Sequence, residues 1–215
     1  MNHIDKQKIP KISVIIPIQN SIKNINQTVD CVLAQTYAAS EIIIVDADST
    51  DGGSVRVERQ HGKNIRVVHQ LSPFLSTARH LGASVAKNEV LAFLNPGDQW
   101  EPHFLEEITR LYNEFPEACC YATAYQLSES ESTFIDPKCT LLSDAKSNLL
   151  LDNYFDLCSK GYTPLMMSNF CIQKSELLRV GSFPKNDMVG ADQEFLARTA
   201  LNSKIAYSQS VLVFY

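Results

Sequence analysis

Short apolar runs alternate with longer amphipathic stretches along most of the chain. Runs rich in β-branched residues predict buried strands at 12–17, 41–45, 65–69, 89–94 and 118–125. Between the first two runs, apolar residues recur at helical spacing, at Ile22, Ile25, Val29, Val32 and Leu33. Because strands separated by helices are typical of βαβ units, the pattern predicts an α/β fold with a mainly parallel sheet and helices on both faces.

Polar residues and prolines predict where several helices begin. We expect Asn20 or Ser21 to cap the first helix and Asp51 to cap the second. Ser72-Pro73 is expected to open the third helix, because proline favours the first turn. The later elements are a helix from 102, an irregular or partly helical insertion over 126–162, a strand over 164–173, a helix over 190–202 and one or two terminal strands over 204–215.

Size and charge narrow the class of protein. The 215 residues suit a single domain, and the net charge of -5 argues against a general nucleic-acid binder. The six cysteines show no C-x-x-C spacing, so we expect buried or free thiols in a reducing compartment. No apolar run approaches a membrane span, and the first eleven residues lack the apolar core of a signal peptide. We therefore expect a cytoplasmic protein, with peripheral attachment at the inner face of the membrane left open.

Acidic side chains stand at three separated places along the chain. They are Asp46, Asp48 and Asp51 after the second strand, Asp98 after the fourth, and Asp192 at the start of the 190–202 helix. In a parallel sheet the first two groups lie at the same edge, and the third reaches it if its helix packs across that edge. Converging carboxylates suit a divalent metal with phosphates, with one carboxylate left to act as a base.

An ordered series of segments resembles the family 2 glycosyltransferases of the GT-A fold. The segments are 13–20, 32–37, 41–52, 76–82, 86–89, 93–100 and 190–198. Each is weak alone, but their order and spacing from about Lys11 to Arg198 are specific. The resemblance implies one GT-A domain over 1–215 with a Rossmann-like sheet. Residues 11–125 would be the nucleotide-sugar-binding half, and 126–215 the acceptor and catalytic-base half.

The resemblance implies transfer of a sugar from a UDP- or GDP-sugar, with inversion, to a hydroxyl of a glycan or lipid-linked acceptor. The product would belong to a polysaccharide or glycoconjugate. Asp192 matches the family's catalytic base, and Asp98 would bind a divalent metal, Mn²⁺ or Mg²⁺. The residues implied for the nucleotide-sugar are Pro17, Gln19, Asn20, Asp46 and Asp48 at the nucleoside, with Arg79 and Asn95 near ribose and diphosphate.

Some positions depart from the family pattern. Gly97 stands where the family most often has its metal ligand, and Ala47 replaces the second acid of an Asp-Asp pair that often reads the nucleobase. Three further positions differ from the residue common in the family, namely Gln19, His80 and Ala191. These departures leave the metal and the nucleobase less well specified than the fold.

Other interpretations of the same residues stay open. Asp192 could serve only as a partner of the helix dipole, Asp98 could be a turn residue, and Trp100 could be either a sugar platform or a packed aromatic. Asp46 and Asp48 also fit a haloacid-dehalogenase-like phosphatase, as nucleophile and acid/base. A glycosyltransferase-like binding domain that has lost turnover is the remaining alternative.

Overall fold

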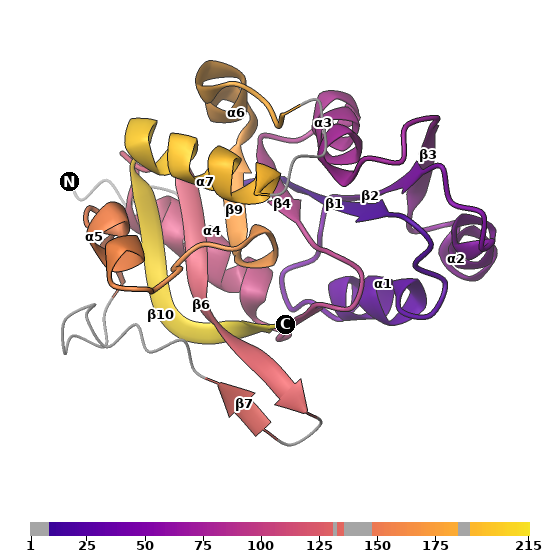
Figure 1. The fold of residues 1–215 in the computed structure, drawn as a ribbon, viewed down its shortest axis with the longest axis horizontal. Coiled ribbons are helices and arrows are strands. Elements are labelled where there is room, and N and C mark those ends of the chain that lie inside the picture. The colour runs from indigo at the N-terminus through magenta and orange to yellow at the C-terminus, as the bar shows by residue number, and fades with distance from the viewer. Residues whose placement is uncertain (1–8, 131–132, 136–147, 185–189) are drawn as a thin grey trace, which may run out of the picture.

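The computed structural model describes residues 9–130, 133–135, 148–184 and 190–215. Its strands are β1 (Ile12–Ile18), β2 (Glu41–Ala47), β3 (Arg66–Gln70), β4 (Val90–Phe93), β5 (Gln99–Trp100), β6 (Cys120–Ser130), β7 (Thr133–Ile135), β8 (Leu149–Leu150), β9 (Phe170–Gln173) and β10 (Ile205–Phe214). Its helices are α1 (Ile25–Leu33), α2 (Gly53–His61), α3 (Leu75–Val85), α4 (Phe104–Glu114), α5 (Tyr154–Ser159), α6 (Lys174–Val180) and α7 (Ala191–Asn202), with a 3-10 turn η1 (Met167–Asn169). Figure 1 shows these elements gathered around one sheet.

The first half of the chain forms the parallel part of the sheet. The strand order within the described residues is β3-β2-β1-β4-β9-β6-β10-β5. The first four strands are parallel, as the alternating pattern predicts. All seven residues of β1 are buried, which explains its nearly continuous apolar run. Asp46 lies opposite Ile18 on one side and His69 on the other, so the carboxyl ends of β1, β2 and β3 meet at one edge.

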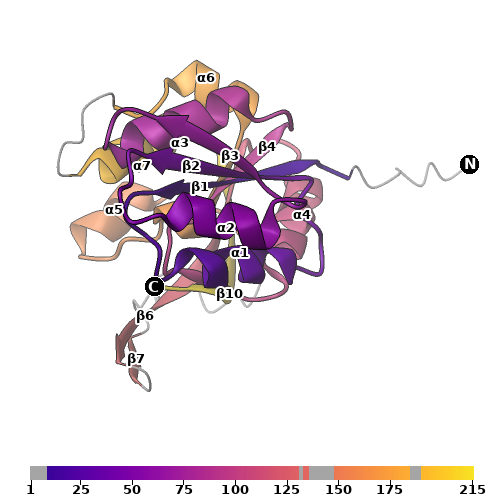
Figure 2. The same ribbon diagram turned by 90° about the vertical axis from the view of Figure 1, so that its right-hand side faces the viewer.

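Beyond β4 the sheet is mixed. β9 lies between β4 and β6 and is antiparallel to both, whereas β10 is parallel to β6 and ends antiparallel to β5. Within the predicted insertion, β6 continues to Ser130 and pairs with β7 in a hairpin that projects from the body of the molecule (Figures 1 and 2). The same stretch contains β8 and α5, and residues 136–147 lie outside the described part.

Helices cover both faces of the sheet, as predicted. Figure 2 shows α3 and α6 on one side of β1–β3, with α1 and α2 on the other. One buried cluster joins the sheet to α3, α5, α6 and α7, and a second joins it to α1, α2 and α4. Each cysteine in the described ranges is a free thiol. Among the helices of those ranges, none combines the length and apolar character that crossing a membrane requires.

The predicted starts of α1 and α3 are wrong, because both helices begin later in the sequence than the expected cap residues allow. α1 begins at Ile25 after the N-cap Asn24, so neither Asn20 nor Ser21 caps it. Leu33, predicted to face inward, is 43% exposed. α3 begins at Leu75 rather than near Ser72, with Phe74 as its N-cap, and the Gln70 side chain donates to the carbonyls of residues 72 and 74 just before the helix.

The predicted strand over 164–173 is only partly correct. η1 precedes β9, and the fully buried Asn169 ends this turn. Its Nδ2 donates to the Thr123 and Pro164 carbonyls at 2.6 and 3.0 Å, while its Oδ1 accepts the Met166 N–H at 2.7 Å. These bonds satisfy backbone groups inside the protein that an extended strand would have paired differently.

Candidate active site

The loops after β1 and β2 are bound to each other through side chains. Asn20 has a left-handed backbone with φ of 49°, and its N–H donates to Ser49 Oγ at 3.0 Å. Its Oδ1 in turn accepts the Thr50 N–H at 2.9 Å. Asn tolerates this backbone conformation better than most residues, so Asn20 shapes the loop that the sequence assigned to nucleoside binding.

Asp46 is already engaged by the protein. Its side chain is 4% exposed, with Oδ1 accepting the Ser49 N–H at 2.9 Å and Oδ2 lying 3.5 Å from His69 Nδ1. The other residues assigned to the nucleoside differ in exposure, since Pro17 is buried within β1 whereas Gln19 and Asp48 are exposed at the same sheet edge. The groups open to a ligand here are therefore those of Gln19, Asp48 and His69.

Asp51 joins the same two loops. It lies one residue before the helix cap Gly52, so the predicted cap position is wrong by one residue. Its two carboxylate oxygens accept the N–H groups of Gly53 and Ile22, each at 2.8 Å. Asp51 therefore supports the first turn of α2 and fixes the loop after β1, and it faces protein rather than ligand.

Arg79 joins the two halves of the chain at the centre of the site. From α3, its Nη1 donates to Asp192 Oδ1 and its Nη2 to Asn95 Oδ1, both at 2.8 Å. The Arg79 side chain is 5% exposed, and that of Asp192 is 30% exposed. A planar guanidinium suits such a two-pronged contact, because its donors point in fixed directions. The predicted diphosphate residue thus orients the predicted base.

Asp98 is held by a residue that the sequence analysis did not select. Ser168 Oγ donates to Asp98 Oδ2 at 2.5 Å and accepts the Asn95 N–H at 3.1 Å. Trp100 Nε1 donates to the Ser168 carbonyl at 2.7 Å. Trp100 is 4% exposed and stacks on Phe104, so it is a packed aromatic and not an open sugar platform.

Burial dominates the electrostatics of Asp98. Desolvation raises the pKa of Asp98 from its ordinary value of 3.8 to about 6. Hydrogen bonds from Ser168 and Asn95, together with the charge of Arg79, lower the pKa but do not outweigh burial. A cation beside Asp98 would also lower the pKa of Asp98, because a nearby positive charge favours the ionised carboxylate.

Gly97 has a structural reason to be glycine. Its φ is 104°, and a Cβ at this position would lie 2.9 Å from Asn24 Nδ2. Its N–H donates to Thr28 Oγ1 at 3.1 Å. An aspartate at this position would require a strained backbone, so the conformation of the loop explains why a ligating side chain is absent there.

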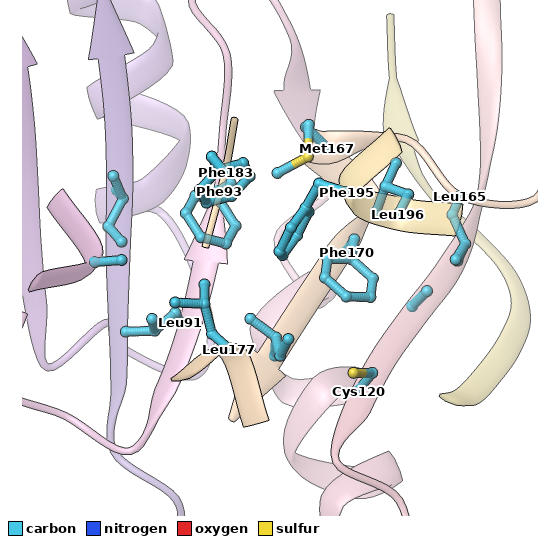
Figure 3. Close-up of a cluster of buried hydrophobic side chains, with 14 of the residues drawn as sticks. Leu91, Phe93, Cys120, Leu165, Met167, Phe170, Leu177, Phe183, Phe195 and Leu196 are labelled. Atoms are coloured by element: carbon cyan, nitrogen blue, oxygen red, sulfur yellow. The ribbon is translucent and has the colours of Figure 1, made fainter. Parts of the chain in front are cut away.

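The buried face of α7 positions Asp192. Phe195 packs between Phe183 and Phe170, with ring centroids 4.1 and 6.3 Å away (Figure 3). Asp192 stands in the first helical turn, where the helix dipole favours a carboxylate, but its bond to Arg79 adds a partner outside the helix. Glu194 pairs with Arg198 one turn later and has a structural role.

The side chains that could ligate a metal restrict how one could bind. Within the described residues, no three His, Cys, Asp or Glu side chains gather as a metal site. Asp98 is the acid of the Asn95–Asp98 loop, and Asn95 Oδ1 already accepts from Arg79. Mg²⁺ often uses one or two carboxylates and takes its other ligands from phosphates and water. Asp98 would therefore be the carboxylate that this loop offers to such a metal, whose other ligands would come from a diphosphate and water.

The family model described as glycosyl transferase family 2 matches residues 13–170. The match includes the loops after β1, β2 and β4 and the Arg79 segment of α3. The chain belongs to glycosyltransferase family 2. Asp46 is also too enclosed to act as the attacking nucleophile of a phosphatase, so the haloacid-dehalogenase interpretation is set aside.

Two relatives of this family 2 chain come from bacteria. An uncharacterized glycosyltransferase of Nostoc sp. is 35% identical over 105 residues, covering 47% of this chain and 33% of that protein. A putative teichuronic acid biosynthesis glycosyltransferase of Bacillus subtilis, TuaG, is 31% identical over 156 residues, covering 66% of this chain and 59% of TuaG. The matched part of this chain thus spans less than two thirds of either relative's length.

The fold resembles that of a solved structure, S. aureus TarS. The crystal structure of S. aureus TarS 1–349 in complex with UDP-GlcNAc superposes with a TM-score of 0.76 at 19% identity, covering 95% of this chain and 58% of that one. This likeness shows that the family 2 chain has the GT-A, Rossmann-like fold.

Two residues that contact the candidate site, Ser168 and His69, were not predicted from the sequence of this family 2 chain. Ser168 lies in a segment predicted to be a strand, where the polar Ser168-Asn169 pair within an apolar run was the available signal. His69 ends a predicted strand directly beside Asp46. Both depend on contacts between separate segments, which hydrophobic periodicity does not report.

Proposed function

We propose that this chain is the donor-binding and catalytic part of an inverting glycosyltransferase that uses a nucleotide-diphosphate sugar. The observation that carries the proposal is the Arg79 guanidinium, which donates to Asn95 in the Asn95–Asp98 loop (the donor loop) and to Asp192 on α7, both at 2.8 Å. It joins the predicted diphosphate side of the site to a carboxylate that is 30% exposed and open to an acceptor.

Asp192 is the general base of the proposed reaction. The acceptor hydroxyl oxygen attacks the anomeric carbon, the bond from that carbon to the diphosphate oxygen breaks, and the hydroxyl proton moves to the Asp192 carboxylate. Attack opposite the leaving group inverts the anomeric centre. Arg79 orients the carboxylate and keeps positive charge near the departing diphosphate.

Asp98 is the proposed protein ligand of a divalent metal, Mn²⁺ or Mg²⁺. When bound, such an ion stabilises negative charge on the leaving diphosphate. Gly97 supplies no side chain, so we expect metal affinity to be weak without nucleotide and to rise when a diphosphate adds its oxygens.

A UDP-sugar is the favoured donor, with a GDP-sugar as the alternative. The bound UDP-GlcNAc in the TarS structure supports a uridine nucleotide. The name of TuaG, which refers to teichuronic acid biosynthesis, supports a role in polysaccharide synthesis. The proposed acceptor is a hydroxyl of a glycan or lipid-linked molecule at the cytoplasmic face of the membrane. Gln19, Asp48 and the Asp46–His69 pair are the proposed nucleoside contacts.

A nucleotide panel combined with Asp192→Asn tests the proposal. One nucleoside diphosphate with Mn²⁺ should selectively raise the unfolding temperature of the wild-type protein, as measured by thermal unfolding. Asp192→Asn should keep that stabilisation but lose transfer by about 10²–10⁴-fold, measured as acceptor-dependent release of the nucleoside diphosphate. Transfer at the wild-type rate would exclude Asp192 as the base.

Binding without any transfer would instead favour a domain that has lost turnover. The specific observations behind that second candidate are Gly97 in place of a ligand and Ala47 in place of an acid. A panel in which no nucleotide shifts the unfolding temperature would contradict both candidates.

A further inference from the structure

Ser168 belongs to the second half of the chain, and its hydroxyl bonds to the first and last residues of the Asn95–Asp98 loop in the first half. Its Oγ lies 2.5 Å from Asp98 Oδ2 and 3.1 Å from the Asn95 N, and the residue is fully buried. One hydroxyl therefore accepts from the first residue of the loop and donates to the last. We propose that Ser168 is a positioning residue that aims the Asp98 carboxylate at the metal and diphosphate of the donor.

The backbone that presents Ser168 is rigidly seated. Asn169 is fully buried and bonds to the Thr123 carbonyl of β6, the Pro164 carbonyl and the Met166 N–H. Trp100 Nε1 binds the Ser168 carbonyl from the other side of the loop. Because Ser168 is fixed on both sides, its hydroxyl has a defined position relative to Asp98.

A partly buried carboxylate is stabilised by such a donor. Ser168 Oγ donates to Asp98 Oδ2 at 2.5 Å, so removing this hydroxyl leaves that oxygen without the bond. Removing the Ser168 hydroxyl would also leave the partly buried Asn95 N–H without this acceptor. Outer residues that hold a metal ligand typically affect metal affinity by about 10–100-fold, and we expect an effect of this size.

This inference rests on the proposed function, because it assigns Asp98 to the metal. The test is calorimetric titration of UDP and GDP, each with MnCl₂ and with EDTA. The variants are Ser168→Ala, Asp98→Asn and their double mutant. Thr199→Val is the matched control, since Thr199 is fully buried and its hydroxyl bonds to the Phe195 carbonyl of its own helix.

The expected result separates metal binding from folding. Ser168→Ala should weaken nucleotide binding about 10–100-fold with Mn²⁺ and by less than about twofold in EDTA. The same change in the Asp98→Asn background should have little further effect, because the serine acts through that carboxylate. Thr199→Val should bind like wild type under both conditions.

Three results would overturn the role of Ser168. They are unchanged Mn²⁺-dependent binding in Ser168→Ala, an equal loss in EDTA, or losses that add fully in the double mutant. If Ser168→Ala does not fold, Ser168→Cys keeps the volume and a weak donor, and should give an intermediate loss. Wild type that binds neither nucleotide in either buffer would instead contradict the proposed function, and this inference would fall with it.

Discussion

Arg79 holds a nearly buried positive charge between residues that lie 16 and 113 positions away in sequence. The charged guanidinium donates one hydrogen bond to the Asp192 carboxylate and one to the Asn95 amide oxygen, both at 2.8 Å. Such bonds are costly to leave unmade when water is excluded. A lysine at this position would keep the charge but would present one ammonium where two separated donors are needed.

We predict that Arg79→Lys lowers the free energy of unfolding by about 1–3 kcal/mol and reduces transfer, because one of the two bonds is lost. Urea unfolding measures the first effect. Arg66→Lys is the control, since its pair with Glu41 is 3.6 Å long and its side chain is 43% exposed, and it should change stability by less than about 0.5 kcal/mol. Equal effects of the two variants would contradict the bridging role.

Asp98 predicts a pH dependence of stability. Its pKa is about 6 in the folded protein against an ordinary 3.8, so between these values the folded state binds more protons than the unfolded state. Stability then falls as pH rises through this window. In EDTA, Asp98→Asn should match wild type near pH 4 and exceed its free energy of unfolding by about 1–3 kcal/mol at pH 7. A difference that is constant with pH would show that burial does not penalise this carboxylate.

At the scale of elements, the contact of α3 with the sheet depends on Gly82. A Cβ there would lie 2.4 Å from Ile15 Cγ2 on β1 and 3.2 Å from Val45 Cγ2 on β2. Both neighbours are fully buried and have no room to move away. The glycine therefore sets how closely α3, and with it Arg79, approaches the strands.

Gly82→Ala should destabilise the protein although alanine favours helices. Overpacking costs about 1–3 kcal/mol, which outweighs a helix-propensity gain of about 0.5–1 kcal/mol. Thermal unfolding measures the net loss. Ser84→Ala, on the exposed side of the same helix, should have little effect, and a stabilised Gly82→Ala would show that α3 shifts freely.

The existence and type of most elements could be predicted, whereas the starts of α1, α2 and α3 could not. β1, β2, β4, α4 and α7 follow directly from apolar runs or helical spacing. Asn20, Ser21 and Ser72 were plausible caps, but Asn20 serves the neighbouring loop and Gln70 binds the carbonyls of residues 72 and 74. Whether a polar residue caps a helix depends on which hydrogen-bond partners the folded structure brings near it, and some of these are distant in sequence.

At the scale of the molecule, the second half packs against the edge of a parallel sheet formed by the first. β9 joins the halves by pairing antiparallel with β4 and β6, and α7 shares its buried cluster with α3. Asp98 and Asp192 consequently meet around Arg79. Asp46 is farther along the edge, since β2 and β4 flank β1 and two strand spacings amount to about 10 Å.

The sequence alone determined the α/β class, the parallel first half and the family resemblance, because apolar periodicity and motif order are properties of contiguous segments. Tertiary structure decided which side chains touch. The bond between Ser168 and Asp98 spans 70 positions, and that between Arg79 and Asp192 spans 113. Such contacts arise only when separate elements pack on one another, and local spacing carries no record of that packing.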